Sequence, residues 1–337
     1  MDLVIKINDR CNFKCDFCSS NEIATNHEDL DIELVKKFLI DNNPSCLIVN
    51  GGDPLMVNPN YYWELIKFIE DNELRTTISL TTNLWDFKLH PDKWVELFKH
   101  KLIGVCTSFQ YGTERKVATG EVYTEELFRE TFKLYEELLG EKLTYIAVIN
   151  DNNEDTVIKT VELAKELGTV CRVNGAVRSG RTTEAYPFYK MVGHYINIIK
   201  RGLSEYEMNC KLLMSSWNNE TTECPFNINC HKEIRCMSPD GTLHTCPSIA
   251  DDILKGTHDF FTLGNSKLPF ELSVVHGQCY TCKAHKICNS CTKRIIDIKK
   301  GVGAEKHCSE MHGYFSDLSR IDEDNLCKNN KQMQSEM

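Results

Sequence analysis

Short apolar runs and longer amphipathic stretches alternate along the first 202 residues, and this alternation restricts the fold more than any other feature. Six of the runs have the length and composition of buried strands, at positions 3–7, 46–50, 76–82, 102–109, 143–149 and 170–177. Amphipathic patterns typical of helices occupy positions 31–41, 61–72, 91–99, 124–139, 154–167 and 185–201. Six strand–helix units in succession predict an α/β fold with a parallel sheet and helices outside it.

Such a sheet is either open and doubly wound or a partial (β/α)6 TIM-like barrel. In both, the functional site lies at the carboxyl ends of the strands. The alternation ends near residue 202, so we expect the barrel domain to cover 1–202. Residues 203–229 form a polar connector, 230–312 a small cysteine-rich domain, and 313–337 a polar tail that we expect to be frayed.

Cysteine is unusually common in this chain, at 17 of 337 residues. The N-terminal sequence has no cationic segment followed by an apolar one, so it predicts no signal peptide, and no apolar run is long enough to span a membrane. We therefore expect a cytoplasmic protein whose thiols stay reduced and either bind metal or pack as small apolar side chains. The net charge of −10 disfavours a broad surface for nucleic acid or anionic membrane.

Three cysteines, Cys11, Cys15 and Cys18, follow the first expected strand closely. They can wrap one small iron–sulfur cluster, but they supply only three of its four iron ligands. An iron with an open position could bind a small molecule and pass it an electron. From the residues alone, the alternative is a zinc site completed by a remote histidine or cysteine.

The spacing Cys-x3-Cys-x2-Cys, with Phe17 before the third cysteine, resembles the signature of radical S-adenosylmethionine (radical SAM) enzymes. The resemblance implies that Cys11, Cys15 and Cys18 hold a [4Fe–4S] cluster, with S-adenosylmethionine (SAM) on the fourth iron. It implies reductive cleavage of SAM to a 5′-deoxyadenosyl radical, which abstracts a hydrogen atom from the substrate. It also implies an external electron donor such as flavodoxin or ferredoxin.

Other positions carry the same resemblance. The sequence Gly51-Gly52-Asp53-Pro54 resembles the family's GGEP motif beside the SAM amino group, with Asp in place of the longer Glu. Asn83 and Ser108 resemble residues beside SAM, although strand-end capping would explain either of them singly. Gln110 stands where many relatives carry Asp. The implied SAM contacts are Phe17, Gly51, Gly52, Asp53, Pro54, Asn83 and Ser108.

Eight further cysteines lie between residues 230 and 308. Their spacing, Cys230-x10-Gly241-x4-Cys246 followed by Cys279-x2-Cys282-x5-Cys288, resembles the SPASM domain that follows the barrel in many radical SAM enzymes. Two Cys-x2-Cys pairs also fit a zinc ribbon, although the five residues between them are few for one. The resemblance implies two auxiliary clusters here, and therefore three [4Fe–4S] clusters in the chain.

By this resemblance each auxiliary cluster has four cysteine ligands. Auxiliary cluster I takes Cys230, Cys236, Cys246 and Cys291. Auxiliary cluster II takes Cys279, Cys282, Cys288 and Cys308. Two residues separate Cys288 from Cys291 where the family has three, and Cys224 is close enough to Cys230 to compete as a ligand of cluster I. Of the remaining cysteines, those on expected strands are read as buried apolar residues: Cys46, Cys106 and Cys171.

The resemblance favours an enzyme that crosslinks or oxidises a peptide or protein substrate, with the auxiliary clusters transferring electrons. The first expected strand begins at residue 3, so we expect no leader-peptide recognition domain before it. This motivates an alternative, a dehydrogenase or epimerase acting on a small-molecule or nucleotide-linked substrate. An alternative of another class is a non-catalytic iron–sulfur electron carrier or zinc-binding module.

Overall fold

The computed structural model describes residues 1–18, 28–178, 182, 184–220, 222–226, 233–244, 246–250, 279, 281–288, 291, 293–294, 297–298 and 303–335. The chain divides into two compact units. The first consists of Met1–Ala185 and Asn229–Lys267, and the second of Tyr186–Ile228 and Leu268–Met337. Within the described residues no helix is both long and apolar enough to cross a membrane.

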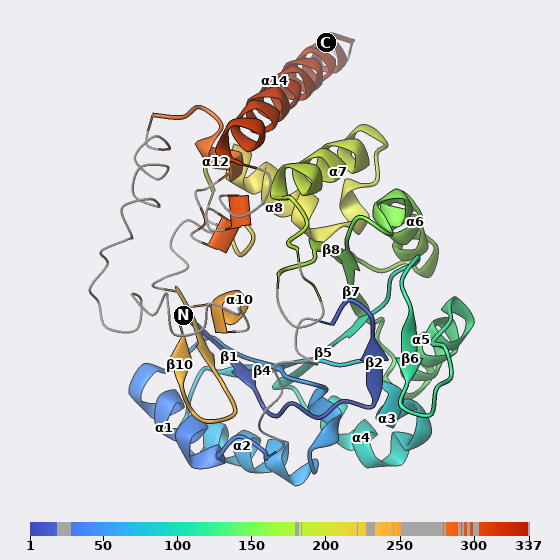
Figure 1. The fold of residues 1–337 in the computed structure, drawn as a ribbon, viewed down its shortest axis with the longest axis vertical. Coiled ribbons are helices and arrows are strands. Elements are labelled where there is room, and N and C mark those ends of the chain that lie inside the picture. The colour runs from blue at the N-terminus through green and yellow to red at the C-terminus, as the bar shows by residue number, and fades with distance from the viewer. Residues whose placement is uncertain are drawn as a thin grey trace. The chain divides into compact units, whose positions relative to one another are not determined.

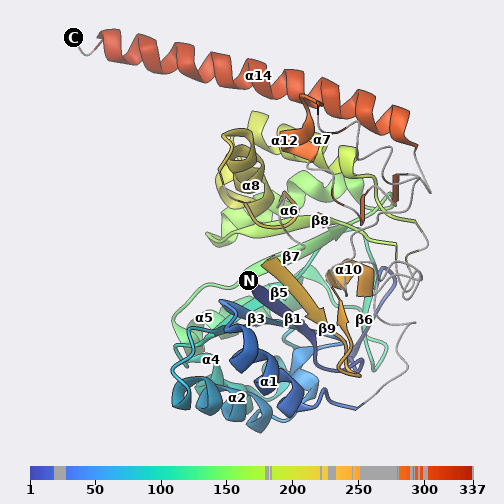
Figure 2. The same ribbon diagram turned by 90° about the vertical axis from the view of Figure 1, so that its left-hand side faces the viewer.

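The first unit contains an eight-stranded sheet in the order β10-β9-β1-β3-β4-β5-β7-β8 (Figures 1 and 2). The six strands from β1 to β8 in this order run parallel and form the expected partial barrel. They are β1 Asp2–Lys6, β3 Cys46–Asn50, β4 Thr77–Thr81, β5 Ile103–Ser108, β7 Thr144–Ile149 and β8 Cys171–Gly175. Each coincides with one of the six predicted strands. The predicted fold class is confirmed.

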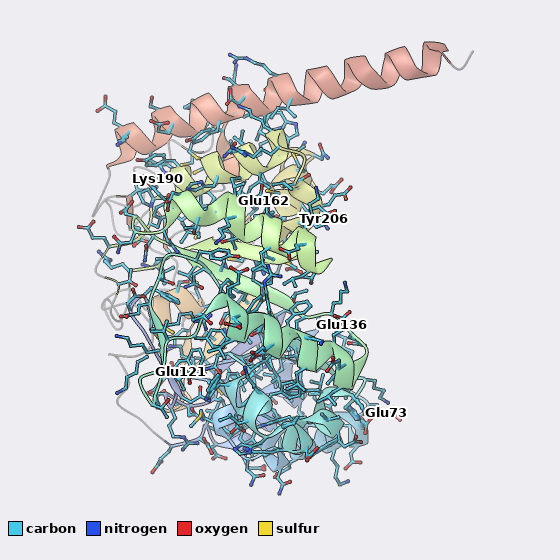
Figure 3. The ribbon with its side chains drawn as sticks, turned by 90° about the vertical axis from the view of Figure 1, so that its right-hand side faces the viewer. Glu73, Glu121, Glu136, Glu162, Lys190 and Tyr206 are labelled. Atoms are coloured by element: carbon cyan, nitrogen blue, oxygen red, sulfur yellow. The ribbon has the colours of Figure 1, made fainter. Side chains whose placement is uncertain are left out.

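Helices lie on the outside of this curved sheet (Figure 1). They are α1 Ile32–Asn42, α2 Asn60–Asp71, α3 Trp85–Leu89, α4 Pro91–Phe98, α5 Glu125–Leu139 and α6 Val157–Leu167, with 3-10 turns η1 Pro54–Met56 and η2 Glu154–Thr156. In α5 the Thr124 hydroxyl accepts a hydrogen bond from the Leu127 amide, and Gly140 ends the helix in a left-handed conformation. The outer side of α5 carries exposed charges such as Glu136 (Figure 3). The sequence missed α3, which has only five residues.

The two faces of the sheet differ in chemistry. Tyr145 on β7 contacts Phe128 of α5, with ring centroids 5.3 Å apart, and donates a hydrogen bond to the Thr160 carbonyl of α6. That face is therefore the helix-covered one. Side chains alternate along a strand, so the register places the neighbouring residues on the opposite, inner face. Near the carboxyl ends of the strands these inner-face residues are polar: Lys6, Asn50, Thr81, Ser108 and Asn174.

Four further strands were not expected, two in a small separate sheet and two at the edge of the main one. β2 Phe13–Cys15 pairs antiparallel with β6 Arg115–Val117, which joins the loops after β1 and β5. β9 Ile234–Met237 runs parallel to β1, and β10 Leu243–His244 pairs antiparallel with β9. The sequence places residues 234–244 in the separate cysteine-rich domain, whereas they extend the sheet, because β1 would otherwise leave an edge of unpaired backbone groups. The short helix α10 Pro247–Ala250 follows.

The second unit is helical in its described part. It contains α7 Phe188–Lys200, η3 Ser204–Tyr206, α8 Met208–Trp217, α12 His285–Cys288 and α14 Ala304–Ser335. α14 packs closely against α7, where the Cα of Gly193 faces the Tyr314 ring. The tail 313–337, expected to be frayed, instead continues α14 to Ser335. After Gly313 this stretch contains no proline and no glycine, so nothing in it interrupts a helix.

Candidate active site

The candidate site lies where the loops after β1, β3, β4 and β5 meet. Gly51 has φ of +136°, and a Cβ there would lie 2.4 Å from the Asn8 carbonyl oxygen. A Cβ on Gly52 would lie 2.0 Å from the Arg10 carbonyl oxygen. Backbone hydrogen bonds of 2.8 Å run from Gly52 N to Asn8 O and from Asp53 N to Arg10 O. Only glycine permits this contact, so the pair fixes the β3 loop against the start of the cysteine loop.

The buried side chain of Asp53 connects the loop after β3 to the loop after β4. Its side chain is 2% exposed, and the carboxylate accepts hydrogen bonds from Thr82 Oγ1 at 2.9 Å and from Asn83 N at 2.7 Å. The Leu55 amide also donates to it, over 2.9 Å. Burial raises the pKa of Asp53 to about 6, against the lowering effect of these hydrogen bonds. The carboxylate thus serves the loops themselves, and its expected contact with SAM stays a prediction.

The cysteine loop is tied to the same network. Cys11 Sγ accepts a hydrogen bond from Phe13 N at 3.3 Å and a longer one from Asn83 Nδ2 at 3.8 Å. Asn83 Nδ2 also donates to Asn12 Oδ1 over 2.7 Å. Cys15 lies on β2, and Cys18 N donates to its carbonyl oxygen at 3.4 Å. Asn83 therefore acts on the cysteine loop directly, as well as capping the end of β4.

The three thiols are close enough for their charges to interact. Burial raises the pKa of Cys11 well above its usual range, with contributions from Asp53, Cys15 and Cys18. Among the described residues, no three histidine, cysteine or acidic side chains gather closely enough to hold one metal ion. An iron–sulfur cluster binds each thiolate through a different iron, so its ligands need not meet at one point. The buried thiols also need a nearby cation to ionise, which such a cluster supplies. The donor set therefore fits a cluster.

The end of β5 carries a buried amide side chain. Gln110, two residues beyond Ser108, is 3% exposed, and both polar atoms of its amide lack a hydrogen-bond partner within the described residues. A buried amide without partners is costly, and a ligand bearing both donors and acceptors would satisfy it. SAM carries both kinds of group, so the site fits it. The Phe17 carbonyl accepts a hydrogen bond from Thr182 Oγ1 at 3.1 Å, which fixes the loop before Cys18.

Comparison with known proteins decides the family of this region. Residues 5–164, which contain Cys11–Cys18, the glycine pair and Ser108, match the family model of the radical SAM superfamily. The chain carries a radical SAM domain. Domains of this superfamily indicate an enzyme.

Two solved structures share the fold of most of the chain. "Native anSMEcpe with bound AdoMet and Cp18Cys peptide" aligns with a TM-score of 0.69 at 17% identity, over 97% of this chain and 99% of that one. SuiB of Streptococcus suis, in its complex with S-adenosylmethionine, aligns with a TM-score of 0.57 at 16% identity, over 88% of this chain and 73% of that one. Both likenesses extend beyond the radical SAM domain.

A curated relative is the GTP 3′,8-cyclase of Staphylococcus carnosus (strain TM300), 24% identical over 191 residues. The alignment covers 53% of this chain and spans less than half of the relative's length, 46%.

The C-terminal cysteines are divided between the two units. Cys236 on β9 is fully buried in an apolar cluster with Val4, Ile48 and Ile234, and Cys246 follows in the same unit. The second unit holds Cys279, Cys282, Cys288, Cys291 and Cys308. Cys230 lies outside the described residues. Cys224 is exposed, and its role as a rival ligand stays a prediction.

Three of the second unit's cysteines interact through their charges, and a fourth lies against the histidine beside one of them. Burial raises the pKa of Cys308, and the charges of Cys279 and Cys282 raise it further. Cys288 Sγ lies 3.3 Å from Nε2 of His307, the residue before Cys308. These are the four residues expected to bind auxiliary cluster II. Their role as ligands stays a prediction.

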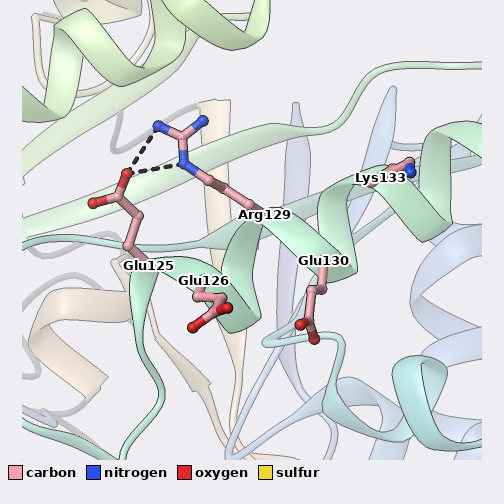
Figure 4. Close-up of a pocket in the computed structure, with 5 residues that line it drawn as sticks. All are labelled: Glu125, Glu126, Arg129, Glu130 and Lys133. Carbon is pink, nitrogen blue, oxygen red and sulfur yellow. Dashed lines mark hydrogen bonds and ion pairs between the residues drawn. The ribbon is translucent and has the colours of Figure 1, made fainter.

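A surface hollow of about 530 Å³ lies along α5 of the radical SAM domain (Figure 4). Its lining residues are all charged: Glu125, Glu126, Arg129, Glu130 and Lys133. Arg129 is already paired with Glu125 and with Glu166, each over 2.8 Å. The hollow belongs to the outer helical layer, whereas the polar residues of the candidate site lie on the inner face of the sheet, so we do not assign it a catalytic role.

The sequence missed one buried charge in the site. Arg115 on β6 is 4% exposed and donates to both the carbonyl oxygen and the Oγ of Ser108. It lies in a run of charged residues, Glu114-Arg115-Lys116, which on its own indicates a solvated loop. The alternation of Arg115 with Val117 is the one local signal of a strand.

Proposed function

We propose that this chain is a radical SAM enzyme that holds a [4Fe–4S] cluster through Cys11, Cys15 and Cys18 and binds SAM against that cluster. One observation carries the proposal. Within the region that matches the radical SAM family model, hydrogen bonds connect the cysteine loop to the Gly51-Gly52 turn and to Asn83. When bound, the cluster and SAM would together supply a 5′-deoxyadenosyl radical able to abstract a substrate hydrogen.

Different residues would contact SAM and position the loops around it. The Gly51-Gly52 turn brings backbone carbonyl groups close to the cysteine loop, where the SAM amino group would bind. Phe17 and Pro54 would contact SAM through their apolar surfaces, and Gln110 would gain the partners that its amide lacks. Asp53 holds the β3 and β4 loops at a fixed separation, so that Asn83 stays against Cys11.

For the substrate, we propose a peptide or protein that is crosslinked or oxidised. Support comes from the fold shared with anSMEcpe and SuiB, each of which has been solved with a peptide bound. The cysteines after the barrel would form a SPASM domain with two auxiliary clusters. All eight of their ligand positions would come from the protein, which favours transfer of the substrate's surplus electron over direct binding of substrate to iron.

A nucleotide substrate is the second candidate. It is favoured by the likeness to a GTP 3′,8-cyclase, whose name states a nucleotide substrate. That alignment covers 53% of this chain, whereas the likeness to anSMEcpe extends over 97% of it. The peptide proposal therefore accounts for more of the molecule.

The first prediction tests the radical chemistry itself. The anaerobically reconstituted chain, given dithionite and SAM, should release 5′-deoxyadenosine, measured by liquid chromatography. Cys15→Ala should lose at least a hundredfold in this product, because one iron loses its thiolate. Cys46→Ala, a strand cysteine outside all ligand sets, should keep it. Equal product from wild type and Cys15→Ala would exclude the proposal, as would none from the wild type.

The substrate class is tested with two probes under the same conditions. One is GTP, and the other is a set of synthetic peptides containing cysteine and serine. Loss of two hydrogens from a peptide, detected by mass spectrometry, supports a peptide substrate. Consumption of GTP with no change in any peptide would overturn that choice and favour the second candidate.

A further inference from the structure

Arg115 is a buried cation on β6, the strand that pairs with the one carrying Cys15. In the pairing of β2 with β6, Arg115 is the register partner of Cys15. Its guanidinium reaches the end of β5, where Nη2 donates to Ser108 Oγ over 2.8 Å and Nη1 donates to the Ser108 carbonyl. One side chain therefore joins the cysteine loop to the strand that ends at the candidate site.

Two aromatic rings fix the position of this charge. The guanidinium carbon lies 5.3 Å from the centre of the Phe13 ring and 5.5 Å from that of Tyr123. Both rings are nearly fully buried, at 2% and 4% exposed. Among the described residues, no carboxylate forms an ion pair with Arg115. A positive charge held in this way is weakly screened and acts strongly on its neighbours.

Cys15 is the neighbour that faces Arg115 directly. Residues paired in this way across two antiparallel strands have Cβ atoms about 5 Å apart on the same side of the strands. A buried guanidinium that stabilises a thiolate also favours any added negative charge at that sulfur. The reduced form of an iron–sulfur cluster carries one more negative charge than the oxidised form.

We propose that Arg115 is a positioning residue that raises the reduction potential of the cluster bound through Cys15. The inference rests on the proposed function, since it requires that cluster. Hydrogen bonds to the cluster sulfurs and nearby charge are among the terms that set such potentials. A fixed cation beside Cys15 makes one-electron reduction by an external donor easier.

The test is an anaerobic redox titration of the full chain without SAM, followed by electron paramagnetic resonance. The signal of the N-terminal cluster is the one that Cys15→Ala lacks. In Arg115→Gln, the ratio of reduced to oxidised cluster at a fixed potential should fall about tenfold, which is about 59 mV for a one-electron couple. Lys116→Gln is the matched control, because Lys116 is the next residue, 43% exposed and paired with Glu114 at 3.0 Å. Its potential should equal that of the wild type.

Arg115→Lys separates charge from folding. It keeps the cation and should keep most of the wild-type potential, and it decides the question if Arg115→Gln assembles no N-terminal cluster. The proposal is overturned if Arg115→Gln shifts the potential no more than Lys116→Gln, or if Arg115→Lys falls by the full tenfold ratio. A wild-type chain that forms no N-terminal cluster would instead contradict the proposed function.

Discussion

The two cysteine regions of the chain are built in different ways. In the N-terminal cysteine loop, residues 8–18, the partners of the Cys11 thiol come from the loops of the sheet: Phe13 N and Asn83 Nδ2 donate to it. The backbone of Gly52 also lies in close contact with that of Arg10. In the C-terminal cysteine segment, residues 279–308, the partners are histidine side chains on or beside α14. His307 lies 3.3 Å from Cys288 Sγ, and His312 lies 3.6 Å from Cys282 Sγ.

The two regions should therefore differ in how well they tolerate substitutions. At Gly51 and Gly52 the backbone lies so close to the N-terminal cysteine loop that even one added methyl group would collide with it. The C-terminal cysteine segment depends on the packing of α14 against α7 within the second unit. Side chains on a helix surface can adjust their rotamers more easily than a strand-end loop can move. We therefore expect small substitutions to disrupt the first region more than the second.

The largest effect should come from Gly52→Ala. The added Cβ would lie 2.0 Å from the Arg10 carbonyl oxygen, a backbone atom that cannot move without displacing the cysteine loop. We expect a loss of about 3 kcal/mol in the free energy of unfolding and loss of the N-terminal cluster. Denaturant unfolding and iron analysis measure the two.

Gly104→Ala on β5 is the matched control, since its Cβ would meet nothing closer than the Ile78 carbonyl oxygen at 4.0 Å. It should retain its iron and unfold close to wild type. A Gly52→Ala chain with full iron content would mean that the contact between the loops is looser than the structure has it.

A pH-dependent effect should follow from Asp53. Its pKa is about 6 in the folded chain against 3.8 ordinarily, so the folded state holds the proton more tightly. The free energy of unfolding therefore falls as pH rises from about 4 to about 6, by about 3 kcal/mol from this group, and is then constant. Asp53→Asn has no proton to lose. The free energy of unfolding of this variant, relative to that of the wild type, should therefore rise by the same amount over this pH range. Urea unfolding of the iron-free chain at several pH values measures this difference, and a constant difference would contradict it.

The sequence identified the barrel because its signal is local. Each strand is a short apolar run, and the predicted strand 46–50 coincides with β3. The three-residue strands β2 and β6 gave no such signal, because about a hundred residues separate them and only the folded chain brings Cys15 to Arg115. The role of Asp53 was hidden for the same reason. The motif marks the residue, but the partners Thr82 and Asn83 come from another loop.

The smallest effect should come from Gly313→Ala, just beyond the C-terminal cysteine segment. Gly313 lies on α14, one residue after His312, and a Cβ there would meet nothing within 4 Å. Gly313→Ala should therefore raise the free energy of unfolding of the second unit by about 0.5 to 1 kcal/mol, because alanine loses less backbone entropy in a helix. Thermal unfolding followed by circular dichroism measures it. A stability gain with unchanged iron content would show that a methyl group is tolerated on α14 beside this segment, whereas a stability loss would place Gly313 in a contact as tight as that of Gly52.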